Sequence, residues 1–148
     1  MLITCPHCSA RNRVEDSRLN DAPTCGKCQG ELLAGAPVTL DESNFSSLIA
    51  ASRRPVAVDF WAPWCAPCRG FAPIFAQAAA MHPELIFAKV DTDANPQIAA
   101  RFAIRSIPTL ALFAAGVAVD RISGALPGPQ FEAWLAAGLL KAKAGDSH

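Results

Sequence analysis

Apolar residues are spread unevenly along this chain of 148 residues. Residues 1–33 are polar and rich in turn-forming types, whereas strand-like and helix-like segments alternate from Val38 onward. A short stretch of glycine, alanine and proline, residues 34–37, separates the two regions. The pattern predicts a small N-terminal domain over residues 1–33, a linker over 34–37 and a larger domain over 38–148.

The larger domain contains short apolar runs of the length expected for strands. VAVDFW, residues 56–61, is nearly continuous, which is typical of a strand covered on both faces, and LIFAKV, residues 85–90, is a second such run. TLALFAAGVAVDRIS, residues 109–123, predicts a hairpin that turns near Gly116.

Helical periodicity fills the intervals between these strands. Asp41 is placed to cap a first helix, and a second follows the CAPC motif with Pro73 as an expected kink. Asn95 and Pro96 have the residue types of an N-cap and a first helical position, and a last helix begins around Pro129. The order β-α-β-α-β-α-β-β-α predicts an α/β fold whose mixed sheet starts parallel and finishes with an antiparallel hairpin.

Composition supports a globular protein and gives no sign of an electrostatic partner. Half of the residues are hydrophobic, and the 13 basic residues are balanced by 13 acidic ones, so we expect neither nucleic-acid nor membrane binding. The richest apolar run, residues 106–119, is shorter than the roughly 18 residues of a membrane span. The first residues lack the basic and apolar regions of a secretory signal, so we expect a cytoplasmic protein. We also expect a monomer.

All cysteines of the chain lie in pairs separated by two residues. Cytoplasmic reductants disfavour structural disulfides, so such pairs are expected to bind metal or to act in catalysis. There are three pairs: Cys5 with Cys8, Cys25 with Cys28, and Cys65 with Cys68.

The third pair, CAPC, stands where a buried strand meets a helix. Unpaired N–H groups and the positive end of the helix dipole stabilise an anion there, so we expect Cys65 to be an exposed, reactive thiolate. Cys68, one turn into the helix, is expected to be shielded and to resolve a mixed disulfide, and Pro67 stiffens the turn. A structural pair or half of a metal site is the alternative, but no further C-x-x-C remains to complete it.

Asp59 interrupts the apolar strand just before this pair. Burial raises the pKa of a carboxyl group, which would suit Asp59 to exchange protons with Cys68. The alternative is a carboxylate that only satisfies backbone donors. Lys89, within LIFAKV, is a candidate charge partner for Asp59, or else a solvated lysine at a sheet edge.

FWAPWCAPCRGFAPIF and KVDTDANPQIAARFAIRSIPT together resemble the thioredoxin family, and the resemblance covers the larger domain. It implies the thioredoxin fold, a cis peptide bond before Pro108 and a groove that binds an extended substrate segment. The residues that would line this groove are Trp64, Pro67, Ile107 and Pro108. Ala66 departs from the family pattern, which usually has glycine there, and we expect this to shift the redox potential modestly without changing the reaction.

The first two pairs have the spacing C-x2-C-x16-C-x2-C, which is that of a four-cysteine zinc site. The predicted ligands of one structural zinc ion are Cys5, Cys8, Cys25 and Cys28. Iron accepts the same geometry, and two local disulfides are the other alternative. Gly26 would allow the turn that directs backbone N–H groups at a sulfur, and His7 is interpreted as a knuckle residue. No strand is expected before CPHC and no helix after it, in contrast to CAPC.

A zinc-ribbon-like domain ahead of a thioredoxin domain resembles the bacterial thioredoxin 2 group. The resemblance implies a protein-disulfide reductase that acts on oxidised partner proteins, with thioredoxin reductase as electron donor and no bound organic cofactor. Two other classes were weighed: a zinc-dependent interaction module with a thioredoxin-like docking domain, and a disulfide-forming oxidase. The zinc-binding domain would either steer partner choice or sense oxidants by losing its metal.

Overall fold

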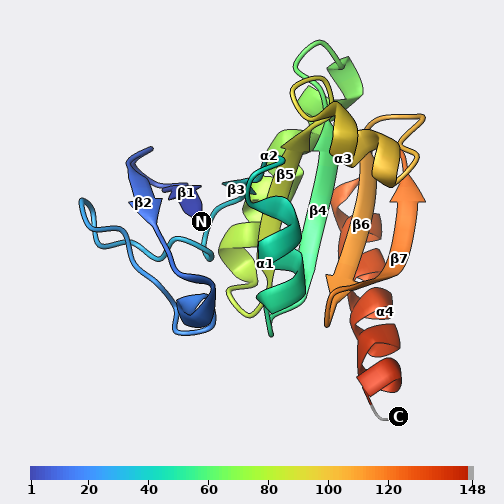
Figure 1. The fold of residues 1–148 in the computed structure, drawn as a ribbon. Helices are drawn as coiled ribbons and strands as arrows, with labels where there is room; N and C mark the ends of the chain where they lie inside the picture. The colour runs from blue at the N-terminus through green and yellow to red at the C-terminus, as the bar shows by residue number, and fades with distance from the viewer. Residues whose placement is uncertain (147–148) are drawn as a thin grey trace.

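A computed structural model describes residues 1–146, with side chains as far as residue 143, and contains two β-sheets (Figure 1). The strands are β1 (Leu2–Thr4), β2 (Arg11–Arg13), β3 (Val38–Thr39), β4 (Val56–Trp61), β5 (Ile86–Asp91), β6 (Thr109–Ala114) and β7 (Val117–Ser123). The helices are the 3-10 turn η1 (Asp16–Arg18), α1 (Phe45–Ala51), α2 (Ala66–Met81), α3 (Pro96–Arg101) and α4 (Gly128–Asp146).

The central sheet has the strand order β3-β5-β4-β6-β7. Strands β3, β5 and β4 are parallel, whereas β6 and β7 are antiparallel to their neighbours. This confirms the predicted mixed sheet that begins parallel and ends in a hairpin. The hairpin turns at Gly116, whose φ of +81° is a conformation that glycine adopts without strain.

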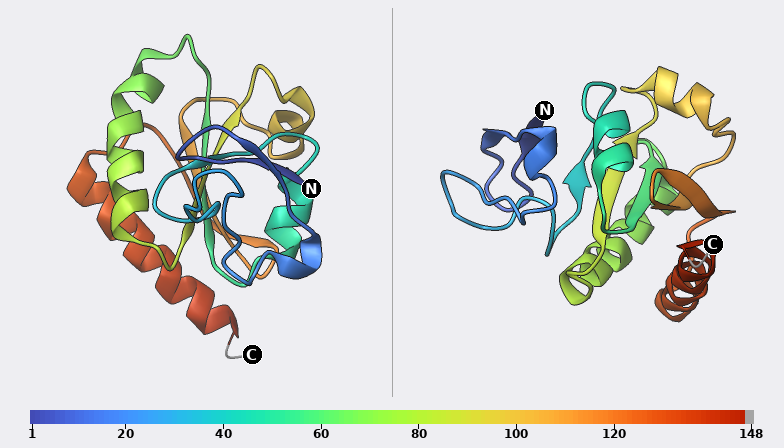
Figure 2. Two further views of the ribbon diagram at one scale, coloured as in Figure 1. Left: turned by 90° about the vertical axis from the view of Figure 1, so that its left-hand side faces the viewer. Right: turned by 60° about the horizontal axis from the view of Figure 1, so that its bottom comes forward.

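Helices cover both faces of the central sheet (Figure 2). Because successive side chains of a strand point to opposite faces, β4 divides its residues between two cores. Val58 and Phe60 pack with α1 and α3, whereas Ala57 packs with α2 and α4. By the same alternation Asp59 lies on the face of Ala57, which is the α2 face.

Two predicted boundaries differ from the structure. Helix α1 begins at Phe45 rather than directly after Asp41, because the Asp41 carboxylate accepts the N–H of Ser43 at 2.8 Å and closes a turn ahead of the helix. Strand β5 begins at Ile86, one residue later than predicted. The predicted start of α3 is confirmed, with Asn95 as N-cap.

The N-terminal region, residues 1–33, forms the two-stranded sheet β1-β2 and η1, and is called the ribbon below. The expectation that no strand precedes Cys5 was wrong, because β1 ends at Thr4. However, β1 pairs antiparallel with β2 and does not enter the central sheet.

Among residues 1–146, none of the helices has both the length and the hydropathy of a transmembrane segment.

The ribbon shares one hydrophobic core with the face of the central sheet that carries α1 (Figure 1). Its fully buried contributors to this core include Ile3, Leu19 and Leu32, which pack in one cluster with Phe45 and Leu48 of α1. A salt bridge of 2.7 Å between Glu31 and Arg54 adds a polar contact across the same boundary.

Candidate functional site: a dithiol at a helix start and a four-sulfur cluster

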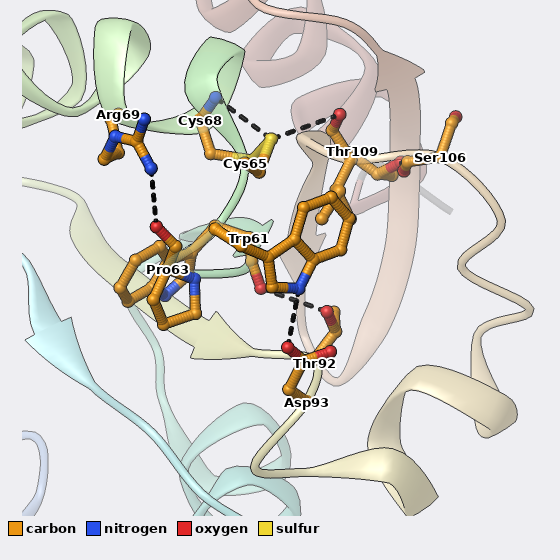
Figure 3. Close-up of a disulfide and its surroundings, with 11 residues drawn as sticks. Trp61, Pro63, Cys65, Cys68, Arg69, Thr92, Asp93, Ser106 and Thr109 are labelled. Carbon is orange, nitrogen blue, oxygen red and sulfur yellow. Dashed lines mark hydrogen bonds between the residues drawn. A yellow bond between two sulfur atoms is a disulfide. The ribbon is translucent and has the colours of Figure 1, made fainter.

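Cys65 and Cys68 form a disulfide at the start of α2 (Figure 3). Cys65 is the N-cap residue, and the backbone N–H of Cys68 donates to its Sγ atom at 3.2 Å. A free N–H at a helix start favours negative charge on the capping atom, so the reduced protein will stabilise the Cys65 thiolate.

Both sulfur-bearing residues are nearly covered, which corrects the expectation of an exposed attacking thiol. Cys65 is 4% exposed and Cys68 1%. Trp61 and Ile107 pack against the pair, and the carbonyl oxygen of Ile107 lies 3.7 Å from Sγ of Cys65. The Ile107–Pro108 peptide bond is cis, as the resemblance implied. The loop before β6 lies against the start of α2 and therefore covers most of the Cys65 side chain.

Asp59 lies at the centre of β4 and is completely buried. Neither carboxylate oxygen has a hydrogen-bond partner among the described residues. Loss of hydration raises the pKa of Asp59 to about 7, although the positive charge of Lys89 lowers it in part. A carboxyl group with this pKa gains and loses its proton near neutral pH, which is the property that an acid–base group needs.

Lys89 lies beside Asp59 in the register of β4 and β5. Its ammonium group is 4.3 Å from the centroid of the Trp61 ring, and no salt bridge to Asp59 forms among the described residues. Lys89 therefore acts on Asp59 through space, while the ring of Trp61 provides its closest stabilising contact.

The structure brings the predicted groove residues next to the dithiol. Trp64 precedes Cys65 and is 67% exposed, which leaves a large aromatic surface beside the nucleophile. Its indole N–H donates to the carboxylate of Asp93 at 2.7 Å. Pro67 is exposed in the first turn of α2, whereas Pro108 is buried.

Sequence reasoning missed two residues that hold this region in place. Asp93 fixes the orientation of Trp64, and the guanidinium of Arg69 donates to the carbonyl oxygen of Pro63 at 2.9 Å (Figure 3). Asp93 lies 29 positions from Trp64 along the chain, so no local pattern could have revealed that pair. Arg69 directly follows Cys68, and its proximity to the motif was the only available signal.

The other cysteines meet in a single cluster in the ribbon. Their sulfur atoms all lie within 4.8 Å of one another. The shortest distances join the two knuckles: Cys5 to Cys28 and Cys8 to Cys25, each 3.6 Å. Four sulfurs at these distances are the donor set of a tetrahedral thiolate site, so the residues fit a metal ion.

Backbone N–H groups point at these sulfurs, as metal-bound thiolates require. His7 donates its N–H to Cys5, and Lys27 donates its own to Cys25, each at 3.4 Å. The expected turn at Gly26 does direct an N–H group at Cys25, but Gly26 itself is not in the left-handed conformation, and its own N–H donates to the side chain of Asn12. The left-handed backbone conformation falls instead after each knuckle, at Ser9 (φ 67°) and Gln29 (φ 65°).

Asn12 is a further contributor that the sequence did not reveal. Its amide N–H group donates to Cys25 at 3.4 Å, while its oxygen accepts from Gly26. Backbone N–H groups together with Asn12 lower the pKa of the Cys25 thiol to about 6. His7 is not a ligand of this cluster; its Nε2 atom lies 3.0 Å from the carbonyl oxygen of Glu31 and 3.2 Å from that of Ala34.

Comparison with known proteins gives two family matches and a set of relatives. A family model described as thioredoxin matches residues 36–137, and one described as thioredoxin 2, N-terminal, matches residues 4–30. Thioredoxin C-3 of Corynebacterium nephridii is 48% identical over 91% of this chain and 93% of its own. Thioredoxin 1 of Nostoc sp. is 48% identical over 64% of this chain and 87% of its own. Putative thioredoxin 2 of Streptomyces coelicolor is 46% identical over 61% of this chain and 66% of its own.

The two matches coincide with the two sites described above. The larger match contains the dithiol at the start of α2, and the smaller contains the four-sulfur cluster. The chain therefore belongs to the thioredoxin family and is a thiol–disulfide oxidoreductase whose redox-active pair is Cys65 and Cys68.

Proposed function

We propose that this protein reduces disulfides of partner proteins through a mixed disulfide on Cys65. The Cys65 thiolate attacks one sulfur of the substrate disulfide, and the other leaves as a thiolate that takes up a proton. The Cys68 thiolate then attacks Sγ of Cys65, forms the Cys65–Cys68 disulfide and releases the second substrate thiol. Two electrons and two protons pass from the dithiol to the substrate.

The observation that carries this proposal is the position of Cys65 as N-cap of α2. Its Sγ atom accepts the N–H of Cys68, and this bond stabilises the thiolate form without any cationic side chain. Among the described residues no N–H group donates to Sγ of Cys68, and Cys68 is more deeply buried than Cys65, which suits a thiol that reacts second.

Asp59 is proposed as the group that accepts the proton of Cys68 before the second attack. Its pKa of about 7 and its place on the α2 face of β4 support this role. Lys89 is proposed to adjust the pKa of Asp59, since its charge favours the ionised carboxylate.

An extended segment of the substrate is proposed to bind beside the dithiol. Trp64 and Pro67 would contact one side of that segment, and Ile107 and Pro108 the other. Exposed aromatic surface at Trp64 supports binding to apolar side chains near the substrate disulfide.

We propose zinc as the metal of the ribbon, held by the four thiolates of the cluster. The ion would have a structural role there, since four protein ligands leave no position for a substrate.

Thioredoxin reductase is proposed as the electron donor and oxidised proteins as the substrates. The protein is proposed to act in the cytoplasm as a monomer. The domain boundaries 1–33, 34–37 and 38–148 also remain our proposal, supported by the interval between the two family matches.

Replacing single cysteines tests the assignment. Cys65→Ser removes the nucleophile, so we expect the reduction of insulin disulfides by dithiothreitol to fall to the rate without protein. Cys5→Ser leaves the dithiol itself intact, so substantial activity is expected to remain at temperatures where the protein is folded. Full activity of the Cys65→Ser variant would overturn the assignment.

A further inference from the structure

Two buried asparagines lie between the ribbon and the loops around the dithiol. Asn44 is 3% exposed and Asn95 6%. Burying an amide group is costly unless its hydrogen-bonding atoms find partners, and both side chains use their oxygen and their nitrogen. Such groups hold the segments that they join in a defined geometry.

Asn44 joins the ribbon to the turn that precedes α1. Its Nδ2 atom donates to the carbonyl oxygen of Leu2 in β1 at 3.0 Å. Its Oδ1 atom accepts the backbone N–H of Asp41 at 2.8 Å. Figure 1 shows β1 close to β3, on the side of the sheet where this turn begins.

Asn95 joins the same turn to the end of β5. Its Oδ1 atom accepts the N–H of Glu42, and its Nδ2 atom donates to the carbonyl oxygen of Asp91, each at 3.0 Å. The Glu42 carboxylate accepts the N–H of Gln97 at 2.7 Å, which ties the turn to the first residues of α3 as well.

From Asp91 the contacts continue to the residue beside the nucleophile. The Asp91 carboxylate accepts the N–H groups of Asp93 at 2.9 Å and of Ala94 at 3.2 Å. The carboxylate of Asp93 accepts the indole N–H of Trp64, as described above. Hydrogen bonds therefore link β1 of the ribbon to Trp64 through the turn before α1 and the loop after β5.

We propose that Asn44 is a positioning residue through which the ribbon holds Trp64 in its place beside Cys65. The ribbon then sets the shape of the substrate groove without touching the substrate. This inference rests on the proposed role of Trp64 in substrate binding, but its structural part can be measured without any substrate.

The chain offers a matched control at the other end of α1. The Oδ1 atom of Asn20 accepts the N–H of Arg53 at 2.8 Å, and its Nδ2 atom donates to the carbonyl oxygen of Ala51 at 3.0 Å. Asn20 thus also fastens the ribbon to α1, but its partners are the last residue of that helix and Arg53 just after it. No hydrogen bond among the described residues continues from these partners toward Trp64.

The experiment measures the exchange of the Trp64 indole N–H with water by NMR, with the signal assigned through Trp64→Phe. In Asn44→Ala we expect this exchange to become about fivefold faster, because loss of one link frees the Asp91–Asp93 loop. In Asn20→Ala it should stay within about twofold of the parent protein. An unchanged rate in Asn44→Ala, or equal acceleration in both variants, overturns the proposal.

A kinetic readout separates positioning from general loosening. Asn44→Ala should raise KM for a protein disulfide by about threefold and leave kcat within about twofold, since the dithiol itself is untouched. If Asn44→Ala does not fold, Asn44→Asp keeps the acceptor for Asp41 and replaces the donor to Leu2 with a carboxylate oxygen, which the carbonyl oxygen of Leu2 repels. The same two measurements apply to that variant. If the parent protein does not reduce disulfides, the proposed function is contradicted. The role of Asn44 is decided separately, by the exchange rates of the Trp64 indole N–H.

Discussion

Among the described residues, Asp59 is the only carboxylate that folding removes completely from water. Its oxygens find no hydrogen-bond donor, so the ionised form is destabilised in the folded state. A strand with valine or leucine at this position would be more stable. The structure thus keeps a destabilising residue on the α2 face of β4, the position that the proposed proton acceptor occupies.

Replacing Asp59 tests whether this residue lowers the stability of the folded protein. The pKa of about 7 in the folded protein exceeds the ordinary value of 3.8, so the folded state binds the proton more tightly, and stability falls as pH rises from about 4 to about 7. Asp59→Asn cannot ionise, so we expect it to raise the free energy of unfolding by up to about 4 kcal/mol at pH 8 and by little at pH 4. Urea unfolding at the two pH values measures the change in the free energy of unfolding that the substitution causes. An equal change at both pH values would contradict the raised pKa of Asp59.

The same variant should slow catalysis. Without a base for Cys68, release of the reduced substrate is expected to become at least about tenfold slower, and its dependence on pH near 7 should vanish. Stopped-flow measurement of mixed-disulfide decay gives this rate. Unchanged decay in Asp59→Asn would remove Asp59 from the mechanism.

At the scale of elements, α2 and α4 are joined at the end of α2 that is remote from the dithiol. His82, the residue after α2, contacts the carboxylate of Glu132 in α4 at 2.8 Å and that of Glu84 at 3.2 Å. Its ring also stacks on Phe87 of β5. Partial burial lowers the pKa of His82, but the two carboxylates outweigh this effect and leave its pKa raised above 6.5.

This junction predicts a pH-dependent contribution to stability. Because the folded pKa is raised, the stabilisation is complete below about 6.5 and is lost as pH rises through the folded pKa. His82→Gln should therefore lower the free energy of unfolding by about 1 kcal/mol at pH 5.5, and by less at pH 9. Denaturant unfolding at both pH values tests this, with Glu132→Gln expected to show the same trend; a loss that does not depend on pH would mean that His82 acts by packing alone.

At the scale of the whole molecule, the ribbon and the central sheet are not independent units. Ile3 and Leu32 of the ribbon belong to the same core as Phe45 and Leu48 of α1. The ribbon itself contains only short strands and one 3-10 turn, so the four-sulfur cluster provides the local constraint that a small polar segment needs in order to fold. Order in the ribbon and stability of α1 are therefore expected to depend on each other.

Metal removal tests this dependence. Chelation under reducing conditions should lower the Tm of the whole protein by several degrees, because loss of ribbon order uncovers apolar surface of α1. Thermal unfolding followed by circular dichroism measures the shift, and Cys5→Ser should show a low Tm that chelation changes little further. An unchanged Tm after metal removal would show that the ribbon packs on α1 without its metal.

Much of the fold and chemistry could be predicted from local sequence. The apolar runs of β4 and β5, the Gly116 hairpin and the helix start at Asn95 all follow from the types of adjacent residues. The helix-start position of Cys65 also follows, because the buried strand before it and the helical periodicity after it are both local signals. The prediction of an exposed Cys65 failed because a loop 42 positions further along the chain covers it.

The two chemistries of this protein can be predicted from short stretches of sequence, since cysteine spacing and helix capping depend on residues within a few positions of one another. The relation between the two sites, in contrast, arises from tertiary packing. The link from Leu2 to Asn44, from Glu42 to Asn95 and from Asp93 to Trp64 joins residues 42, 53 and 29 positions apart. Hydrogen bonds between such distant residues depend on how the chain packs, so no periodicity or motif records them.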